Sequence, residues 1–328
     1  MHIHTMETNN FASTAVGVVG AAGYTGQEVL RLLAHHPGAD LRFATSDSEA
    51  GEDAGVSGLT LTPAADAPLQ EVDVVFLCVP HGAAVPWVER ARSAGARVVD
   101  LTADHRPGSG REEASGAVYG LPELHGDAVA RADLVANPGC YPTGVQLALR
   151  PLLDAGLVAS DDTVVVNAAS GVTGAGRTPK RSLLFAEVAG DYRAYGLGNE
   201  HRHLKEIRVG LPGLPILFQP HLLPVARGIL ETIYLPVPPG VGPDQVRAAW
   251  SERYAEARAL RVWSRGVPAL TDVVGTDRLD LGVVANAGLP GHLTVVAALD
   301  NLGKGAAGQA VQNFNLMTGQ PSDRGIRC

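Results

Sequence analysis

Residues 15–35, AVGVVGAAGYTGQEVLRLLAH, contain a short apolar run, a glycine-rich turn and a stretch with helical periodicity. The turn runs from Gly20 to Gly26 and has glycine at its first, fourth and seventh positions. Because glycine lacks a side chain, backbone N–H groups of such a turn can approach a pyrophosphate, and the following helix presents its positive end. This order predicts a dinucleotide-binding unit; a tight turn without a ligand is the alternative.

The alternation of apolar runs and helical stretches continues along the first half of the chain. Apolar runs that end in short polar loops recur at 41–44, 72–79 and 98–101. Strands that alternate with helices form parallel sheets through right-handed crossovers, and ligands bind at the carboxyl ends of the strands. We therefore expect an α/β protein whose first domain is a Rossmann-type parallel sheet.

Beyond residue 140 the pattern changes. Strand-like runs separated by polar or Gly/Pro-rich segments occur at 163–168, 230–237 and 293–299, which indicates a mixed sheet. Residues 303–317 have a helical apolar face suited to packing on the first lobe. The expected domains are a disordered extension (1–14), a discontinuous dinucleotide-binding domain (15–140 and 302–328) and an α+β catalytic, substrate-binding and oligomerisation domain (141–301).

Composition narrows the class of function. The 328 residues are 45% hydrophobic and 18% charged, which is enough for two lobes and too apolar for broad disorder. The net charge of -8 and the scattered basic residues argue against nucleic-acid binding. Three cysteines lack metal-ligand spacing, and neither a signal peptide nor a membrane-spanning run is recognisable. We expect a cytoplasmic protein that acts on small molecules, without a membrane partner.

The segment 137–143, NPGCYPT, places Cys140 in a turn just before a predicted helix. Exposed N–H groups at a helix N-terminus lower the pKa of a thiol and can hold a developing oxyanion. Cys140 is therefore predicted to be an acyl-transfer nucleophile. The alternative is a small buried side chain, which is the state expected of Cys78.

A nucleophilic thiol needs a proton partner, and His201 and His203 flank Arg202 in a strongly charged stretch. Either histidine could titrate near neutral pH. The two could also bind a metal, but no third ligand recurs at a fixed spacing, so we expect no metal.

Two loops that follow predicted strands end in arginine, the side chain best suited to bidentate binding of carboxylate or phosphate. They are 170–177, SGVTGAGR, and 100–106, DLTADHR. A flexible surface loop and a surface ion pair are the respective alternatives. After the second strand, Ser46 is suited to a cofactor phosphate, whereas Asp47 would accept hydrogen bonds from a ribose. These residues leave the choice between NADP(H) and NAD(H) open.

Together these motifs resemble the N-acetyl-gamma-glutamyl-phosphate reductases of arginine biosynthesis, which are relatives of the aspartate-semialdehyde dehydrogenases. The resemblance covers residues 15–317 and includes ordered matches at 80–82 (PHG), 119–123 (YGLPE), 220–224 (PHLLP) and 300–302 (DNL). It implies that a homo-oligomeric, cytoplasmic enzyme reduces N-acetyl-gamma-glutamyl phosphate to the semialdehyde with NADPH.

The resemblance also implies roles for single residues. Cys140 is the nucleophile and His203 the acid/base, with His201 as the alternative. The residues expected to contact the substrate are Arg106, Asn137, Ser170 and Arg177. Those expected to contact the cofactor are Gly20, Gly23, Tyr24, Thr25, Gly26, Ser46, Gly174 and Asn301. Asp47 stands where the family usually has an arginine that contacts the 2′-phosphate, which keeps NAD(H) as an alternative cofactor.

Two other functions stay open. One is the homologous reductase of lysine biosynthesis, whose substrate is one methylene longer. One methylene changes binding by only about 1–3 kcal/mol, so the sequence does not report the width of the pocket. The other is a catalytically silent dinucleotide-binding module. A homodimer and a homotetramer are both compatible with the resemblance.

Overall fold

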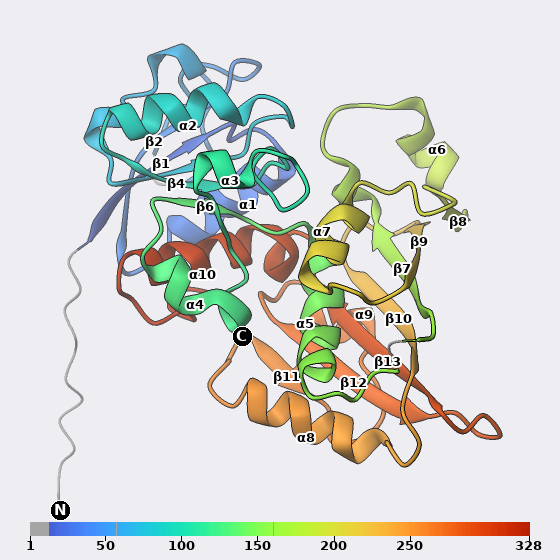
Figure 1. Ribbon diagram of the computed structural model, residues 1–328. Coiled ribbons are helices and arrows are strands. Elements are labelled where there is room, and N and C mark those ends of the chain that lie inside the picture. The colour runs from blue at the N-terminus through green and yellow to red at the C-terminus, as the bar shows by residue number, and fades with distance from the viewer. Residues whose placement is uncertain (1–12, 57, 160) are drawn as a thin grey trace, which may run out of the picture.

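The computed structural model describes residues 13–56, 58–159 and 161–328. Of the extension expected over 1–14, residues 1–12 lie outside the described residues. Thr14 begins the first strand. The described residues form two lobes, each built around its own sheet (Figure 1). Within the described ranges, every helix is too short or too polar to cross a bilayer.

The first lobe contains a parallel sheet in the order β2-β1-β3-β4-β6-β5. Its strands are β1 (Thr14–Val19), β2 (Ala39–Thr45), β3 (Val74–Leu77), β4 (Arg97–Asp100), β5 (Val118–Tyr119) and β6 (Leu134–Ala136). The helices of this lobe are α1 (Tyr24–Leu33), α2 (Ala84–Ser93), α3 (Glu112–Ser115) and α4 (Pro122–Ala130). The expected Rossmann-type sheet is confirmed. β5 and β6 were not predicted, because two or three residues are too few to show a periodicity.

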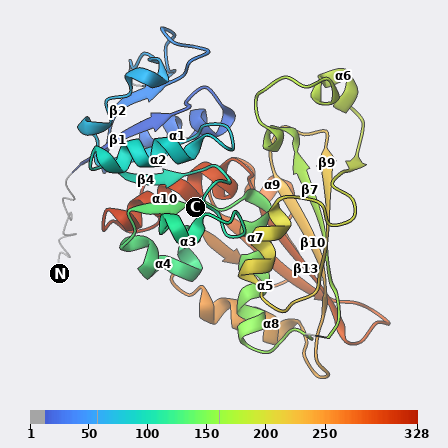
Figure 2. The ribbon, with the colours of Figure 1, turned by 45° about the horizontal axis from the view of Figure 1, so that its top comes forward.

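The second lobe contains a mixed sheet in the order β11-β12-β13-β10-β7-β9-β8. Its strands are β7 (Val164–Gly171), β8 (Arg193–Ala194), β9 (Ile216–Leu223), β10 (Ile229–Pro236), β11 (Leu260–Val262), β12 (Leu279–Ala285) and β13 (His292–Leu299). Its helices are α5 (Cys140–Asp154), α6 (Phe185–Val188), α7 (His203–Gly210), α8 (Pro243–Arg253) and α9 (Leu270–Val273). Figure 2 shows α5, α7 and α8 on one face of this sheet. The expected mixed sheet is confirmed.

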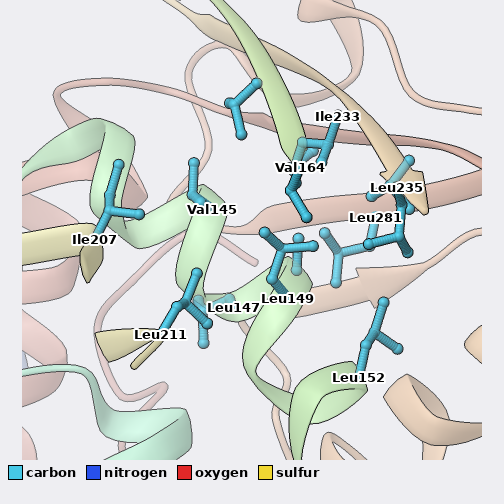
Figure 3. Packing of buried hydrophobic residues seen from close by; sticks show 14 of the residues in the cluster. Val145, Leu147, Leu149, Leu152, Val164, Ile207, Leu211, Ile233, Leu235 and Leu281 are labelled. Carbon is cyan, nitrogen blue, oxygen red and sulfur yellow. The ribbon is translucent and has the colours of Figure 1, made fainter. Parts of the chain in front are cut away.

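The core of the second lobe lies between α5 and the sheet (Figure 3). Leu149 and Leu152 of α5 lie in one buried cluster with Ile233 and Leu281 of the strands. Each such side chain contributes on the order of 2 kcal/mol through removal of apolar surface from water. This packing fixes the axis of α5 and hence the position of its first residue, Cys140.

The C-terminal part of the chain returns to the first lobe. A π-helical turn, η5 (Gly303–Ala307), leads directly into α10 (Gly308–Met317). Phe314 of α10 is fully buried and packs against Phe76 of β3, with ring centroids 5.8 Å apart. The sequence predicted helix over 303–317. The π-helical hydrogen-bond pattern of its first turn is not visible in hydrophobic periodicity.

A buried carboxylate connects the two lobes. Glu28 of α1 pairs with Arg31 at 2.6 Å, with Arg227 at 3.1 Å and with Arg327 at 2.8 Å. Arg227 belongs to the β9–β10 turn of the second lobe, and Arg327 is the next-to-last residue. Burial opposes ionisation of Glu28, but hydrogen bonds from Arg31 and Arg227 outweigh it and lower its pKa to about 2. The lobes are therefore joined by an ionised carboxylate.

Replacing Glu28 tests this connection. Because the folded pKa is depressed, the carboxylate stabilises the fold above the ordinary pKa of about 4.5, and this contribution is lost as the pH falls toward about 2. We expect Glu28→Gln to lower the free energy of unfolding at neutral pH by on the order of 2–3 kcal/mol. Urea denaturation between about pH 3 and about pH 7 measures the difference, which should shrink toward acid. A difference that does not change with pH would contradict the depressed pKa.

Candidate active site

The glycine turn lies where the strand order of the first sheet reverses. β1 pairs with β2 on one side and with β3 on the other, so its carboxyl end opens into a crevice. A Cβ at Gly20 would lie 2.6 Å from the carbonyl oxygen of Cys78, and one at Gly26 would lie 2.5 Å from that of Gly20. Any other residue at these two positions would force the turn apart.

The middle of the same turn is open. At Gly23 the atom nearest to an added Cβ lies 3.9 Å away. Tyr24 and Thr25 lie in the first turn of α1, where the leading N–H groups of a helix have no partner within the helix, and Gly23 before them has no side chain to cap them. The arrangement fits the pyrophosphate of a dinucleotide, because both a close backbone approach and a helix N-terminus are present.

The loop after β2 lies beside the glycine turn. The hydroxyl of buried Ser46 shares a 3.3 Å hydrogen bond with that of Ser48 and accepts the N–H of Glu49 at 3.2 Å. Asp47 is exposed, and its carboxylate accepts the N–H of Ala64 at 2.8 Å. The Asp47 carboxylate is therefore tethered to the backbone of a neighbouring loop.

Cys140 lies at the same edge of the first sheet, four residues beyond β6, where the two lobes meet. Its side chain is half-buried. A Cβ on Gly305 of the π-helical turn would come within 2.9 Å of the Cβ of Cys140, so this glycine makes room for the nucleophile. On the other side, Gly139 donates its N–H to Glu206 at 3.0 Å. The cysteine is thus held from both lobes.

His203 lies directly beside the turn that precedes Cys140. A Cβ on Gly139 would come within 2.8 Å of Nε2 of His203. The ring is buried, and its Nδ1 has no hydrogen-bond partner in the described part of the chain. His201 accepts the backbone N–H of His203 through its own Nδ1 at 3.2 Å. His203 therefore presents a ring nitrogen to the turn before Cys140, and His201 supports the backbone that carries it.

A bend at Asn199 directs the two histidines toward the site. Asn199 has a φ of +62°, in the left-handed region that asparagine tolerates better than most residues. Its side chain accepts the N–H of Phe218 at 2.8 Å and donates to the oxygen of Ile216 at 3.1 Å. These two hydrogen bonds fix the bend to the start of β9. The sequence did not predict this role of Asn199.

Glu206 is a second residue that the sequence analysis missed. Its buried carboxylate accepts hydrogen bonds from the Tyr119 hydroxyl at 3.1 Å, from Gly139 N–H and from Arg106 at 3.3 Å. Arg106 also donates to two main-chain oxygens, one of them that of Asn137 at 2.7 Å. These bonds hold the loop after β4 against the cysteine turn. The expected contact of Arg106 with the substrate stays a prediction.

Other expected contact residues have partners within the chain. The amide of buried Asn137 donates to the oxygen of Ala306 at 3.1 Å and accepts from Asn313 at 3.0 Å. Ser170, at the end of β7, is also buried, and its hydroxyl lies 3.2 Å from where a Cβ on Gly174 would be. Their contacts with substrate and cofactor stay predictions.

The loop after β7 crosses to the first lobe. Asn301 donates to the Thr173 hydroxyl at 2.9 Å and accepts the N–H of Gly228 at 2.8 Å, which holds two loops of the second lobe together. Arg177 donates to the carbonyl oxygen of Ala22 at 2.7 Å. Arg177 thus contacts the glycine turn, and its expected contact with the substrate stays a prediction.

The electrostatics of the cysteine and the histidine favour neutral forms. Burial raises the pKa of the Cys140 thiol to about 11, although the charge of Arg106 and the N–H of Tyr141 act in the opposite direction. The predicted lowering of this pKa was therefore wrong, because burial outweighs the helix N-terminus. Burial and then the charge of Arg106 hold the pKa of His203 well below its ordinary value. A neutral imidazole beside the turn that carries a neutral thiol fits a base that accepts the thiol proton as the sulfur attacks.

The pH dependence of alkylation tests the raised thiol pKa. We expect the rate of Cys140 carbamidomethylation by iodoacetamide to rise about tenfold per pH unit up to about pH 10, because the thiolate fraction does so below a pKa of about 11. Mass spectrometry of quenched digests separates Cys140 from Cys78, whose pKa burial raises further and which should react more slowly. A rate that levels off below about pH 9 would show a lowered pKa instead.

Known proteins match the chain along most of its length. The family model described as semialdehyde dehydrogenase, NAD binding domain, matches residues 15–132. The model described as semialdehyde dehydrogenase, dimerisation domain, matches residues 140–301. The N-acetyl-gamma-glutamyl-phosphate reductase of Desulfotalea psychrophila is 39% identical over 95% of this chain and 97% of its own. That of Magnetococcus marinus is 41% identical over 93% of this chain and 94% of its own.

Solved structures share the fold at lower identity. Aspartate semialdehyde dehydrogenase II of Vibrio cholerae, complexed with ASA, has a TM-score of 0.77 at 18% identity and covers 93% of this chain and 98% of its own. The aspartate semialdehyde dehydrogenase of Candida albicans, solved with NADP, has a TM-score of 0.67 at 17% identity and covers 94% and 99%. At these identities the likeness shows the fold.

Proposed function

Because the chain belongs to the N-acetyl-gamma-glutamyl-phosphate reductase family, we propose that it reduces N-acetyl-gamma-glutamyl phosphate to N-acetylglutamate 5-semialdehyde with NADPH. One observation carries the assignment of residues. Nε2 of His203 lies against Gly139, the residue immediately before Cys140 at the start of α5. This contact supports a nucleophile and a base that meet at the turn before α5, at the edge of the sheet that also bears the glycine turn.

In the first half of the proposed reaction the Cys140 sulfur attacks the gamma-carbonyl carbon while His203 accepts the thiol proton. Main-chain N–H groups at the start of α5 hold the negative oxygen of the tetrahedral intermediate. The carbon–oxygen bond to phosphate then breaks. The products of this half are a thioester on Cys140 and inorganic phosphate, which takes up one proton from the solvent, and the thiol proton is on His203.

The second half reduces the thioester. Gly20, Gly23 and Gly26 would hold NADPH at the glycine turn, and the bound cofactor would supply the hydride that the thioester carbon accepts. His203 donates its proton to the resulting thiohemiacetal oxygen. The carbon–sulfur bond then breaks, which releases the aldehyde and returns the thiol of Cys140. In this scheme Glu206 is a positioning residue, because it holds Gly139 and lies on the same helix as His203.

We also propose the state and place in which the chain works. The dimerisation-domain match over 140–301 supports self-association, and we propose a homodimer or homotetramer formed through the second lobe. We place the reaction in the cytoplasm, a compartment that keeps thiols such as Cys140 reduced.

Cys140→Ser tests covalent catalysis. The hydroxyl is a far weaker nucleophile at neutral pH, so NADPH oxidation with the acyl phosphate should fall below detection. Binding of NADPH, followed by its fluorescence, should stay unchanged, which separates lost chemistry from lost folding. Near-wild-type turnover of the variant would rule out the thioester.

Alanine replacements distinguish the two histidines. His203→Ala should lower kcat by about 10²-fold or more, the usual contribution of a positioned acid/base. His201→Ala is the matched control and should lower kcat less, because His201 supports His203 and Tyr141 through backbone and ring contacts, whereas Nε2 of His203 lies against Gly139. Steady-state rates at saturating substrate measure both. A larger loss in His201→Ala would reverse the assignment.

A further inference from the structure

Arg177 bridges the two segments that flank the adenosine ribose in dinucleotide-binding sheets of this kind. It belongs to the second lobe, but its Nη1 donates to the carbonyl oxygen of Ala22 at 2.7 Å and lies 2.7 Å from Oε1 of Glu49. Ala22 is part of the glycine turn after β1, and Glu49 is part of the loop after β2. A cation from one lobe therefore lies at the adenosine end of the crevice in the other.

The loop after β2 has no cation of its own. Residues 46–49, SDSE, carry two hydroxyls and two carboxylates. The Asp47 carboxylate is tied to the N–H of Ala64 at 2.8 Å, and the hydroxyls of Ser46 and Ser48 pair with each other. A phosphate on the ribose needs a cationic donor in addition to hydroxyl groups. The loop by itself is therefore incomplete as a phosphate site.

We propose that Arg177 binds the 2′-phosphate of NADP(H) and makes the site select NADP(H) over NAD(H). This rests on the proposed function only in the identity of the cofactor. The Arg177 side chain is 44% exposed, and its described contacts use Nη1 alone. Its Nε and Nη2 therefore remain available for a two-point contact with phosphate oxygens, which the planar guanidinium geometry favours. Glu49, which pairs with the guanidinium, also donates its backbone N–H to the hydroxyl of Ser46 at 3.2 Å, so the cation is tied to the residue next to the serines.

The same contact links the cofactor to the substrate side. Arg177 lies in the loop that follows β7, and Thr173 of this loop is hydrogen-bonded to Asn301 at 2.9 Å. Ser170, at the start of this segment, is buried beside it. A 2′-phosphate bound by Arg177 thus adds a tie between the first lobe and the loop that carries Ser170 and Thr173.

Arg90 provides a matched control. It is a second arginine near this end of the crevice, on α2, with Nη2 3.5 Å from the oxygen of Ala65 and its guanidinium 4.2 Å from the Trp87 ring. Ala65 follows Ala64, which tethers Asp47, and Trp87 lies on α2 itself, so neither contact is on the glycine turn. Removal of the Arg90 charge therefore changes the local electrostatic potential without removing the proposed contact between Arg177 and the 2′-phosphate.

The test compares Arg177→Leu, Arg177→Lys and Arg90→Leu by calorimetric titration with four ligands: NADP⁺, NAD⁺, 2′,5′-ADP and 5′-AMP. Arg177→Leu should weaken NADP⁺ and 2′,5′-ADP about 10- to 100-fold, the range for hydrogen bonds to a charged group. Binding of NAD⁺ and 5′-AMP should stay within about twofold. Arg177→Lys should recover part of the loss. Arg90→Leu should bind all four ligands like the wild type.

Several results would overturn the proposal. Equal weakening of NADP⁺ and NAD⁺ by Arg177→Leu would mean that the side chain only supports the glycine turn. If Arg90→Leu lost the preference for NADP⁺ over NAD⁺ while Arg177→Leu kept it, the 2′-phosphate would bind at α2 instead. A raised KM for the semialdehyde with unchanged cofactor binding would assign Arg177 to the substrate. Because 2′,5′-ADP binding requires no turnover, a failure of the proposed reaction would be seen separately, as an inactive wild-type protein.

Discussion

The active site depends on the way in which one buried carboxylate is satisfied. A carboxylate removed from water is stable only when hydrogen bonds replace its hydration. Glu206 meets this condition with donors from three separate segments: Tyr119, Arg106 and the N–H of Gly139. His203 precedes Glu206 by three residues on α7, and positions three apart share a helix face. The bond that anchors Glu206 to Gly139 therefore also places the imidazole beside the cysteine turn.

Burial then determines how the pair can react. It raises the pKa of the Cys140 thiol and lowers that of His203, so the two groups are neutral together near neutral pH. A neutral thiol resists oxidation, because sulfenic acid forms from the thiolate. The proton moves when an activated carbonyl is in place, since bond formation to carbon compensates for the cost of ionising the sulfur. Reactivity is thus tied to the presence of a substrate.

The two lobes supply different parts of the chemistry and are held together by charge and by close packing. The first lobe contributes the glycine turn, and the second contributes His203 and the loop that carries Arg177. Cys140 lies at their junction, against Gly305 of the π-helical turn. Glu28 and its arginines link α1 to the β9–β10 turn and to the C-terminal end of the chain. Relative movement of the lobes would break these ion pairs, which favours one fixed geometry at the cysteine.

The sequence by itself determined the features that depend on neighbouring residues. Strand, glycine turn and helix follow from a local pattern, and Cys140 stands out because its turn and its helix are adjacent to it. The tertiary structure decided everything that depends on distant residues. It showed that the Cys140 pKa is raised, that Glu206 is buried and that Arg177 contacts the glycine turn. Burial, ion pairs and ring contacts join segments far apart in the chain, and no periodicity or local motif records which segments will meet.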